Sequence, residues 1–436
     1  MDRTALSLPI LISLVVGNMI GTGIYVLPAS LAQYGTVSLF SWLYTALGAM
    51  CIALTLARLN KRFPKTGGPY VYCKEAYGKP IGFFVAYMYW ICNAVSIAGL
   101  AVASVSYLGF IMPILDSNNE LYKPHAALIL ELCVVWGFTY VNILSIHIAG
   151  VVQFILTIIK VIPLLVISLL GLEKIHIVNL VQFTPNHMTY FSAISGAAAL
   201  TFWAFIGLEA ATIPAENTRG NKDIARATIY GTLLTSFIYI VSTFVLMGMI
   251  PLSQLQNSQF PFSIASTLLF GHMGAILVTG CAVISGLGAL NVCVLLQGQI
   301  VFAAARDNVF PSMFAKLSKN DVPISGQLLS SGLVTLLLIF TIEPMLLNQF
   351  NYIALLAALL ALITYLITSF SEIKFLYVEM NNKGQLILNK KFLIPILAVL
   401  YSLWMLISLE EKILFAGSII LVIFIPIYFL TVKRQG

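Results

Sequence analysis

The feature that most constrains this chain is a succession of apolar runs about 20 residues long, the length at which a helix crosses a bilayer. Short polar stretches rich in Gly and Pro separate these runs. Hydrophobic residues make up 60% of the 436 residues and charged residues only 9%, whereas a soluble globular protein carries roughly a quarter charged residues. So few charges cannot cover a water-exposed surface, and we expect an all-α integral membrane protein in a lipid bilayer.

Dividing the chain at its polar, Pro- and Gly-rich stretches gives about twelve membrane spans. The first run is not expected to be a signal peptide, because it lacks a small-residue cleavage site and continues into more apolar sequence. The expected spans cover residues 6–32, 37–59, 81–115, 126–144, 148–172, 190–214, 225–250, 271–304, 324–342, 350–370, 392–409 and 413–431.

The distribution of basic residues tests this division, because cytoplasmic loops carry an excess of Lys and Arg. With both termini in the cytoplasm, nineteen of the 23 Lys and Arg fall in tails and loops on that side. The opposite side holds Lys123, Lys174 and Lys412, and Lys160 lies within a span. If the number of spans before any basic loop were wrong, the basic residues would be divided between the two sides of the membrane. We therefore expect a multi-pass protein of the cytoplasmic (inner) membrane with both termini cytoplasmic.

Two of the spans are interrupted at their centres. The first contains three Gly within residues 17–23, and the sixth contains Gly207 followed by Pro214. A Gly inside a helix costs about 1 kcal/mol relative to Ala, and in lipid any freed backbone group must find a partner or face a cavity. Gly17 and Gly21 alone could equally serve close packing of helices.

The spacing of the two interruptions favours broken helices over simple packing. The interruptions lie five spans apart, and because five is odd, the second block of five spans enters the membrane inverted. Interrupted spans at matching places in two halves indicate an inverted-repeat transporter with its site at mid-membrane. We expect one domain over 1–436, with a first repeat at 6–172, an inverted second repeat at 190–370 and two accessory helices at 392–431.

Three ionisable side chains fall well inside spans, where a charge costs roughly 3 kcal/mol or more. Glu131 lies near His125 at the outer end of the fourth span, so we expect it to reach the interface and serve structure. Glu209 directly follows the break in the sixth span, which favours a functional role. Lys160 lies in the middle of the fifth span, either as a proton carrier or as a cation that pins helices through backbone carbonyls or a carboxylate.

Several classes of function find no support in the sequence. The net charge of +7 comes without a basic stripe that carries interleaved aromatics, so no nucleic acid is expected as a partner. The six Cys are scattered singly and are expected to be small buried hydrophobes, and the five His show no spaced pairing. No metal or other cofactor is expected. No nucleotide-binding loop, zinc-protease motif or nucleophile elbow occurs, and a channel or receptor fits twelve spans poorly.

Several stretches of the chain resemble the amino acid–polyamine–organocation transporters. Within this superfamily the chain is most similar to the basic amino acid/polyamine antiporters, the arginine/agmatine and ornithine/putrescine exchangers. The resemblance extends over essentially the whole chain and implies a LeuT-type 5+5 inverted repeat with broken helices 1 and 6. The stretches that carry it are residues 17–28, 63–70, 203–209, 247–251 and 302–311.

The resemblance also implies a substrate site between the two broken spans. Amides around residues 20–23 would receive the substrate carboxylate at a helix N-terminus, where the helix dipole favours negative charge. Carbonyls of residues 203–206 would take the α-ammonium. The Trp203 ring would cap the occluded substrate, and Tyr89 and Tyr365 would close the outer and inner routes. The implied substrate-binding residues are Asn18, Ile20, Gly21, Thr22, Gly23, Trp203, Ile206, Cys293 and Ala357.

Some positions depart from the arginine exchangers. Cys293 stands where they place a Trp on span eight, Ile97 replaces an Asn, and Ala357 replaces a Ser. A Trp face is worth about 0.5–2 kcal/mol to a guanidinium, so its absence predicts a different or less selective side-chain pocket. Glu209 corresponds to the family's acidic residue linked to protons. Lys160 resembles instead the lysine of proton-coupled permeases, which occupies the place of a coupling sodium ion.

Together these features predict a secondary active transporter that works by alternating access and is not an enzyme. It would exchange a cationic amino acid for its amine, such as arginine for agmatine or ornithine for putrescine. The alternative is a proton-coupled symporter of broader or neutral specificity that uses Lys160, with Glu209 as the second candidate for proton coupling. The sequence leaves open the exact substrate, exchange against proton symport, and the oligomeric state, for which a homodimer is allowed.

Overall fold

The computed structural model describes residues 7–65, 67–144, 149–181, 184, 188–212, 221–318, 322–343, 345–382 and 390–432. Within these ranges the chain is helical, with no strand. The α-helices are α1 (Leu8–Met19), α2 (Gly23–Ala32), α3 (Ser38–Arg62), α4 (Pro69–Tyr77), α5 (Lys79–Leu108), α6 (Pro124–Leu144), α7 (Ala149–Gly171), α8 (Ile177–Leu180), α9 (Tyr190–Trp203), α10 (Asn221–Met249), α11 (Leu252–Leu255), α12 (Pro261–Arg306), α13 (Ile324–Phe340), α14 (Leu346–Asn382), α15 (Leu393–Ile407) and α16 (Glu411–Val432).

Many of these helices have the length and composition of membrane spans. Among the described residues, eight are long and apolar enough to cross a bilayer, or nine when α1 and α2 count as one bent span. Short 3-10 turns join some of them: η1 (Pro113–Leu115), η2 (Leu172–Lys174), η3 (Ala210–Thr212), η5 (Ser312–Ala315) and η6 (Lys390–Phe392). The all-helical membrane architecture expected from the sequence is therefore confirmed.

The first span is broken where the sequence predicts it. Helix α1 ends at Met19 and α2 begins at Gly23 on an axis bent by 44°. Ile20 adopts an extended conformation (φ −84°, ψ 97°), which ends the helix between the two halves. The three residues at the break are therefore outside regular helix, and their backbone groups are available to other partners.

The helix at the position of the expected sixth span also ends where the interruption is expected. Helix α9 ends at Trp203, an irregular turn follows, and η3 resumes after it. Gly207 in this turn has φ of +102°, a conformation that side chains rarely adopt. An ideal Cβ at Gly207 would lie 2.5 Å from Nδ2 of Asn18, so the two breaks touch each other there. Pro214 lies outside the described residues.

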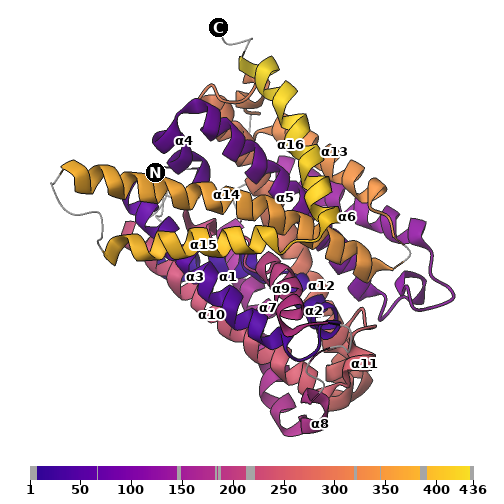
Figure 1. Cartoon of the computed structure of the whole chain (residues 1–436). Helices are drawn as coiled ribbons and strands as arrows, with labels where there is room; N and C mark the ends of the chain where they lie inside the picture. Colours follow the sequence, from indigo (N-terminus) through magenta and orange to yellow (C-terminus); the bar gives the residue numbers. More distant parts are fainter. Residues whose placement is uncertain are drawn as a thin grey trace.

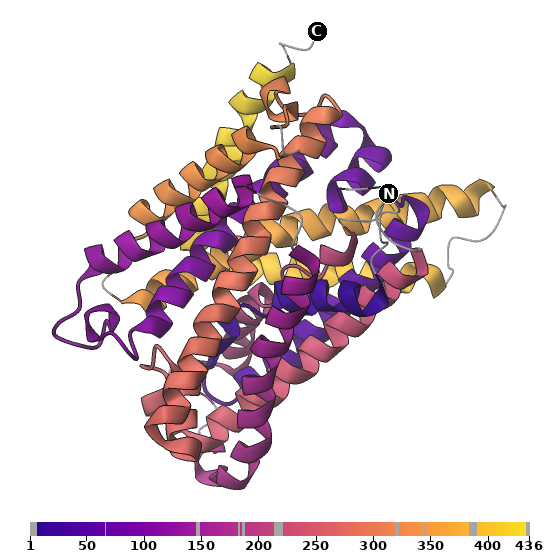
Figure 2. The same cartoon turned by 180° about the vertical axis from the view of Figure 1, so that it is seen from behind.

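The helices that carry the breaks are held in the interior by longer neighbours. Helix α10 packs against both α1 and α3, while α5 packs against both α12 and α14. Figure 1 shows α14 and α15 side by side across the molecule, with α1, α7 and α9 below α15 in this view. From the other side, α12 runs along nearly the whole length of the molecule (Figure 2). Most of the residues around the two breaks belong to one buried hydrophobic cluster.

Two expectations about single residues are corrected by this packing. Glu131 does not reach an interface: it is buried, at 1% exposure, and neither carboxylate oxygen has a hydrogen-bond partner among the described residues. Helices α5, α12 and α13 all pack on α6. All six Cys are free, but Cys133 is exposed, so not every Cys is a buried hydrophobe.

A polar contact outside the spans fastens α4 to the end of α12. Lys74 Nζ lies 2.7 Å from Asp307 Oδ2, and Tyr70 donates to the same oxygen at 2.9 Å. Partial burial favours the neutral form of Asp307, but these hydrogen bonds outweigh it and hold its pKa below the ordinary value of 3.8. The contact stabilises the folded state at neutral pH.

Candidate functional site: a cavity at the two helix breaks

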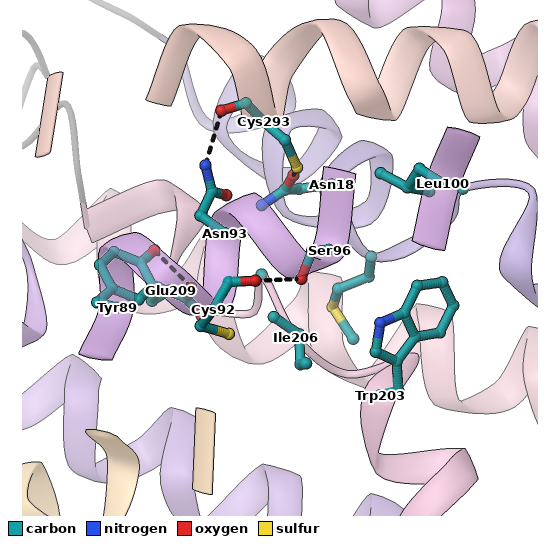
Figure 3. Close-up of a pocket in the computed structure, with 13 residues that line it drawn as sticks. Asn18, Tyr89, Cys92, Asn93, Ser96, Leu100, Trp203, Ile206, Glu209 and Cys293 are labelled. Atoms are coloured by element: carbon teal, nitrogen blue, oxygen red, sulfur yellow. Dashed lines mark hydrogen bonds between the residues drawn. The ribbon is translucent and has the colours of Figure 1, made fainter. Parts of the chain in front are cut away.

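A small cavity of about 40 Å³ lies where the two broken spans meet α5 and α12. That volume is enough for a few water molecules. Figure 3 shows Tyr89 and Glu209 at one side of the cavity and Trp203 at the other. The predicted site residues that line it are Asn18, Gly21, Tyr89, Trp203, Ile206, Glu209 and Cys293.

The end of the cavity at Gly21 offers an unpaired backbone donor. In a continuous helix the Gly21 amide would bond to Gly17 O, but the break removes this bond. The Gly21 amide has no hydrogen-bond partner among the described residues. It precedes α2, whose N-terminus carries a partial positive charge. This end of the cavity is therefore suited to an anionic group.

A side chain at Gly21 would displace Leu100, because an ideal Cβ would lie 2.5 Å from Leu100 Cδ2 on α5. The next residue, Thr22, turns its hydroxyl away from the cavity. That hydroxyl lies 2.9 Å from Ser104 Oγ and 3.2 Å from Ala282 O. Thr22 thus holds the break against α5 and α12, and its side chain is structural rather than a lining group.

Trp203 covers the break in the first span. Its ring packs so closely on α2 that an ideal Cβ at Gly23 would lie 1.9 Å from its Cζ3 atom. The ring of Phe350 meets it edge-on at 5.1 Å. The indole Nε1 is buried, has no partner among the described residues, and faces the side chains that line the cavity (Figure 3). Trp203 therefore brings a second unpaired donor to the site.

Glu209 supplies the one carboxylate among the described lining residues. Tyr89 donates to its Oε1 at 2.6 Å, and Tyr365 donates to its Oε2. All three side chains are buried, with Glu209 at 1% exposure. Both tyrosines therefore bind the same carboxylate in this conformation, and their assignment to the outer and inner routes stays a prediction.

The side of the cavity away from Glu209 is polar but uncharged. Asn93 Nδ2 donates to Cys293 O at 2.8 Å, and Cys293 Sγ lies 3.8 Å from Asn18 Oδ1 (Figure 3). No Lys or Arg is among the described residues that line the cavity. The cavity therefore combines an acid and neutral amides, which suits a cationic ligand.

Several predicted site residues lie beside the cavity rather than on it. Ile20 and Ala357 are fully buried and do not line it; the Ala357 carbonyl accepts a weak bond from Cys92. Gly23 lies under the Trp203 ring, which leaves no room for a Cβ there unless the ring moves. Ile97, at the position of an Asn in the exchangers, is also buried away from the cavity.

Lys160 lies behind the first break, at 0% exposure. Its ammonium donates to Gly17 O at 2.8 Å and lies 3.5 Å from an ideal Cβ at Gly288 of α12. Gly17 O is the carbonyl that the break deprives of its helical donor. Of the contacts expected for Lys160, the structure therefore shows the one with a backbone carbonyl. The ammonium lies at the C-terminal end of α1, where the helix dipole is negative.

The sequence argument missed six lining residues. One face of α5 carries most of them, with positions three, four and seven residues apart, which is the repeat of a single helical face. Polar Asn93 and Ser96 inside an otherwise apolar span were the available signal. The missed residues are Met19, Cys92, Asn93, Ser96, Leu100 and Gly207.

Comparison with known proteins places this geometry in a family. Residues 6–434 match the family model described as amino acid permease. The chain belongs to the amino acid permease family, and it is an integral, multi-pass membrane protein.

Curated relatives cover most of the chain. The putrescine transporter PotE of Haemophilus influenzae is 30% identical over 411 residues, which are 92% of this chain and 91% of the relative. PotE of Escherichia coli K12 is 31% identical, with 92% and 90% covered. The cadaverine/lysine antiporter of E. coli K12 is 32% identical over 330 residues, with 74% and 72% covered. These relatives are transporters.

Proposed function

We propose that this protein is an antiporter that exchanges a cationic amino acid for the diamine or amine with the same side chain. The relatives, a putrescine transporter and a cadaverine/lysine antiporter, suggest the substrate class. Ornithine with putrescine and lysine with cadaverine are therefore the pairs to test first. Arginine with agmatine ranks after them, because Cys293 replaces the expected Trp.

The observation that carries the proposal is the charge pattern of the cavity. Glu209 is the single acid in the described lining, Lys and Arg are absent from it, and Gly21, whose amide has no partner among the described residues, is part of it. A carboxylate of an amino acid would bind the amide end, while ammonium groups would bind the acid and the neutral amides. A diamine shares the ammonium groups and lacks the carboxylate, so both members of a pair can use one site.

The same proposal includes the membrane topology. The bent first span, the break after α9 and the apolar helices α13 (17 residues) and α16 (22 residues) supplement the eight long helices. They support twelve spans, with broken helices 1 and 6, a 5+5 inverted repeat over 6–172 and 190–370, and accessory helices at 392–431. The distribution of Lys and Arg supports cytoplasmic termini in the inner membrane.

Counterflow in proteoliposomes tests the function directly. Vesicles are loaded with unlabelled ornithine, lysine or arginine, and uptake of labelled putrescine, cadaverine or agmatine is followed. Exchange predicts rapid uptake into vesicles that hold a partner and negligible uptake into empty vesicles. Equal uptake into loaded and empty vesicles would rule out an antiporter.

Proton-coupled symport is the second candidate, and buried Lys160 is the observation that favours it. An ammonium on the carbonyl of a broken helix can be charged and partnered or neutral and free, and the two states can follow two conformations. Empty vesicles with an imposed pH gradient separate the candidates. A symporter accumulates labelled amino acid under the gradient, whereas an exchanger does not.

A further inference from the structure

We propose that Tyr239 of α10 ties the two broken helices together and thereby makes transport depend on exchange; this inference rests on the proposed antiport. The Tyr239 hydroxyl lies 2.7 Å from Met19 O and 3.1 Å from Ala204 O. Met19 is the last residue of α1, and Ala204 directly follows α9. One hydroxyl therefore contacts the carbonyl ends of both breaks.

These two carbonyls need a donor because a helix leaves its last carbonyls unpaired. In an unbroken first span Met19 O would accept from the amide of Gly23, but the 44° bend separates the two halves. A buried carbonyl without a partner is costly in a membrane protein. The hydroxyl has a single proton, which the two carbonyls share. If the two breaks moved apart, one of the two carbonyls would lose the hydroxyl as its donor.

The ring of Tyr239 is buried and packs against two other aromatic rings, one of which follows the second break. The side chain is at 0% exposure, and its ring centroid lies 5.0 Å from that of Trp42 on α3 and 5.7 Å from that of Phe205 after the second break. Within the described ranges, no other side chain hydrogen-bonds to both breaks. Lys160, by comparison, bonds to the first break alone.

This bridge, the Tyr239 hydroxyl between Met19 O and Ala204 O, is costly to break in an empty carrier and less costly in a loaded one. If the empty carrier changes orientation, the two breaks shift relative to each other and one carbonyl loses its donor. A substrate that lies between the breaks brings ammonium donors to the same carbonyl ends, so the loaded carrier can release the bridge. Return of the empty carrier is therefore slow, and net flux needs substrate in both directions.

Tyr239→Phe tests this role because it keeps the ring and removes the hydroxyl. Tyr87→Phe is the matched control: the Tyr87 hydroxyl donates to Ile420 O at 3.3 Å, on α16 and away from both breaks. Efflux of labelled putrescine and cadaverine from proteoliposomes is measured with and without external substrate. We expect Tyr239→Phe to lower the ratio of exchange to unstimulated efflux at least fivefold, through faster unstimulated efflux, and Tyr87→Phe to leave it unchanged.

Three results would overturn the role. A wild-type ratio in Tyr239→Phe rejects the bridge alone. A parallel fall of both rates shows that the hydroxyl merely supports the fold. An absence of stimulation in the wild type rejects the antiport proposal itself, and the bridge with it. Should Tyr239→Phe purify poorly, deuterium exchange of amides at 18–23 and 203–208 gives a second readout: without substrate it must be faster in the variant than in Tyr87→Phe.

Discussion

Replacing Gly23 with Ala should disturb the site through Trp203 rather than through the backbone. The added Cβ would lie 1.9 Å from Cζ3 and 2.3 Å from Cη2 of the ring, whereas carbon atoms in contact prefer about 3.5–4 Å. The ring must therefore move by well over 1 Å. Gly23 is helical, so the backbone itself accepts Ala. Overpacking of this kind costs about 1–3 kcal/mol, which equals a loss in affinity of about five- to 150-fold if it falls on binding.

A double-mutant cycle with Trp203→Ala measures this coupling. Thermal unfolding in detergent and binding of labelled putrescine are recorded for the wild type, both single variants and the double variant. Without the ring, Gly23→Ala should be neutral, or stabilising by up to about 1 kcal/mol, since Ala is the better helix former. If Gly23→Ala lowers stability and affinity equally with and without the Trp203 ring, close contact with that ring does not explain the need for glycine at this position.

Three further outcomes follow from the contacts. Glu209→Gln removes one acceptor from its two tyrosine donors, so exchange assayed from pH 5 to 8 should be slower and lose its pH dependence; an unchanged profile would remove Glu209 from proton coupling. Lys160→Ala should keep substrate exchange, because the side chain lies off the cavity, but lose any accumulation driven by a pH gradient; accumulation at the wild-type level would make the lysine structural. Asp307→Asn should lower the melting temperature at pH 7. Because the pKa of Asp307 is held below 3.8, the contribution of its contact with Lys74 is present above that pH and fades as the pH falls through the lowered value, so the difference from wild type should shrink in acid and persist at neutral pH.

The breaks could be predicted from the sequence because Gly and Pro act locally. The Gly residues within 17–23 and Gly207 weaken a helix whatever its neighbours are. A carboxylate such as that of Glu209 is costly in lipid, so a position beside a break, where a cavity can form, is favoured. Contacts between distant spans carry no such local signal. The periodicity of α5 shows which positions share a face, but not that this face meets α12. For the same reason the burial of Glu131 could not be read from its distance to the end of a span.

The groups left unpaired in the cavity predict which member of a substrate pair binds more tightly. Two carbonyls at the breaks have protein donors, Gly17 O from Lys160 and Met19 O from Tyr239, and the Glu209 carboxylate has two. Two donors of the lining residues lack a partner among the described residues, the Gly21 amide and the Trp203 indole. An amino acid can satisfy them with its carboxylate, and its diamine cannot. Hydrogen bonds to charged groups contribute about 1.5–3 kcal/mol each, so lysine should bind at least about tenfold more tightly than cadaverine, and ornithine more tightly than putrescine. Equilibrium binding to the purified protein measures both pairs, and equal affinities within a pair would show that these two donors do not face the ligand.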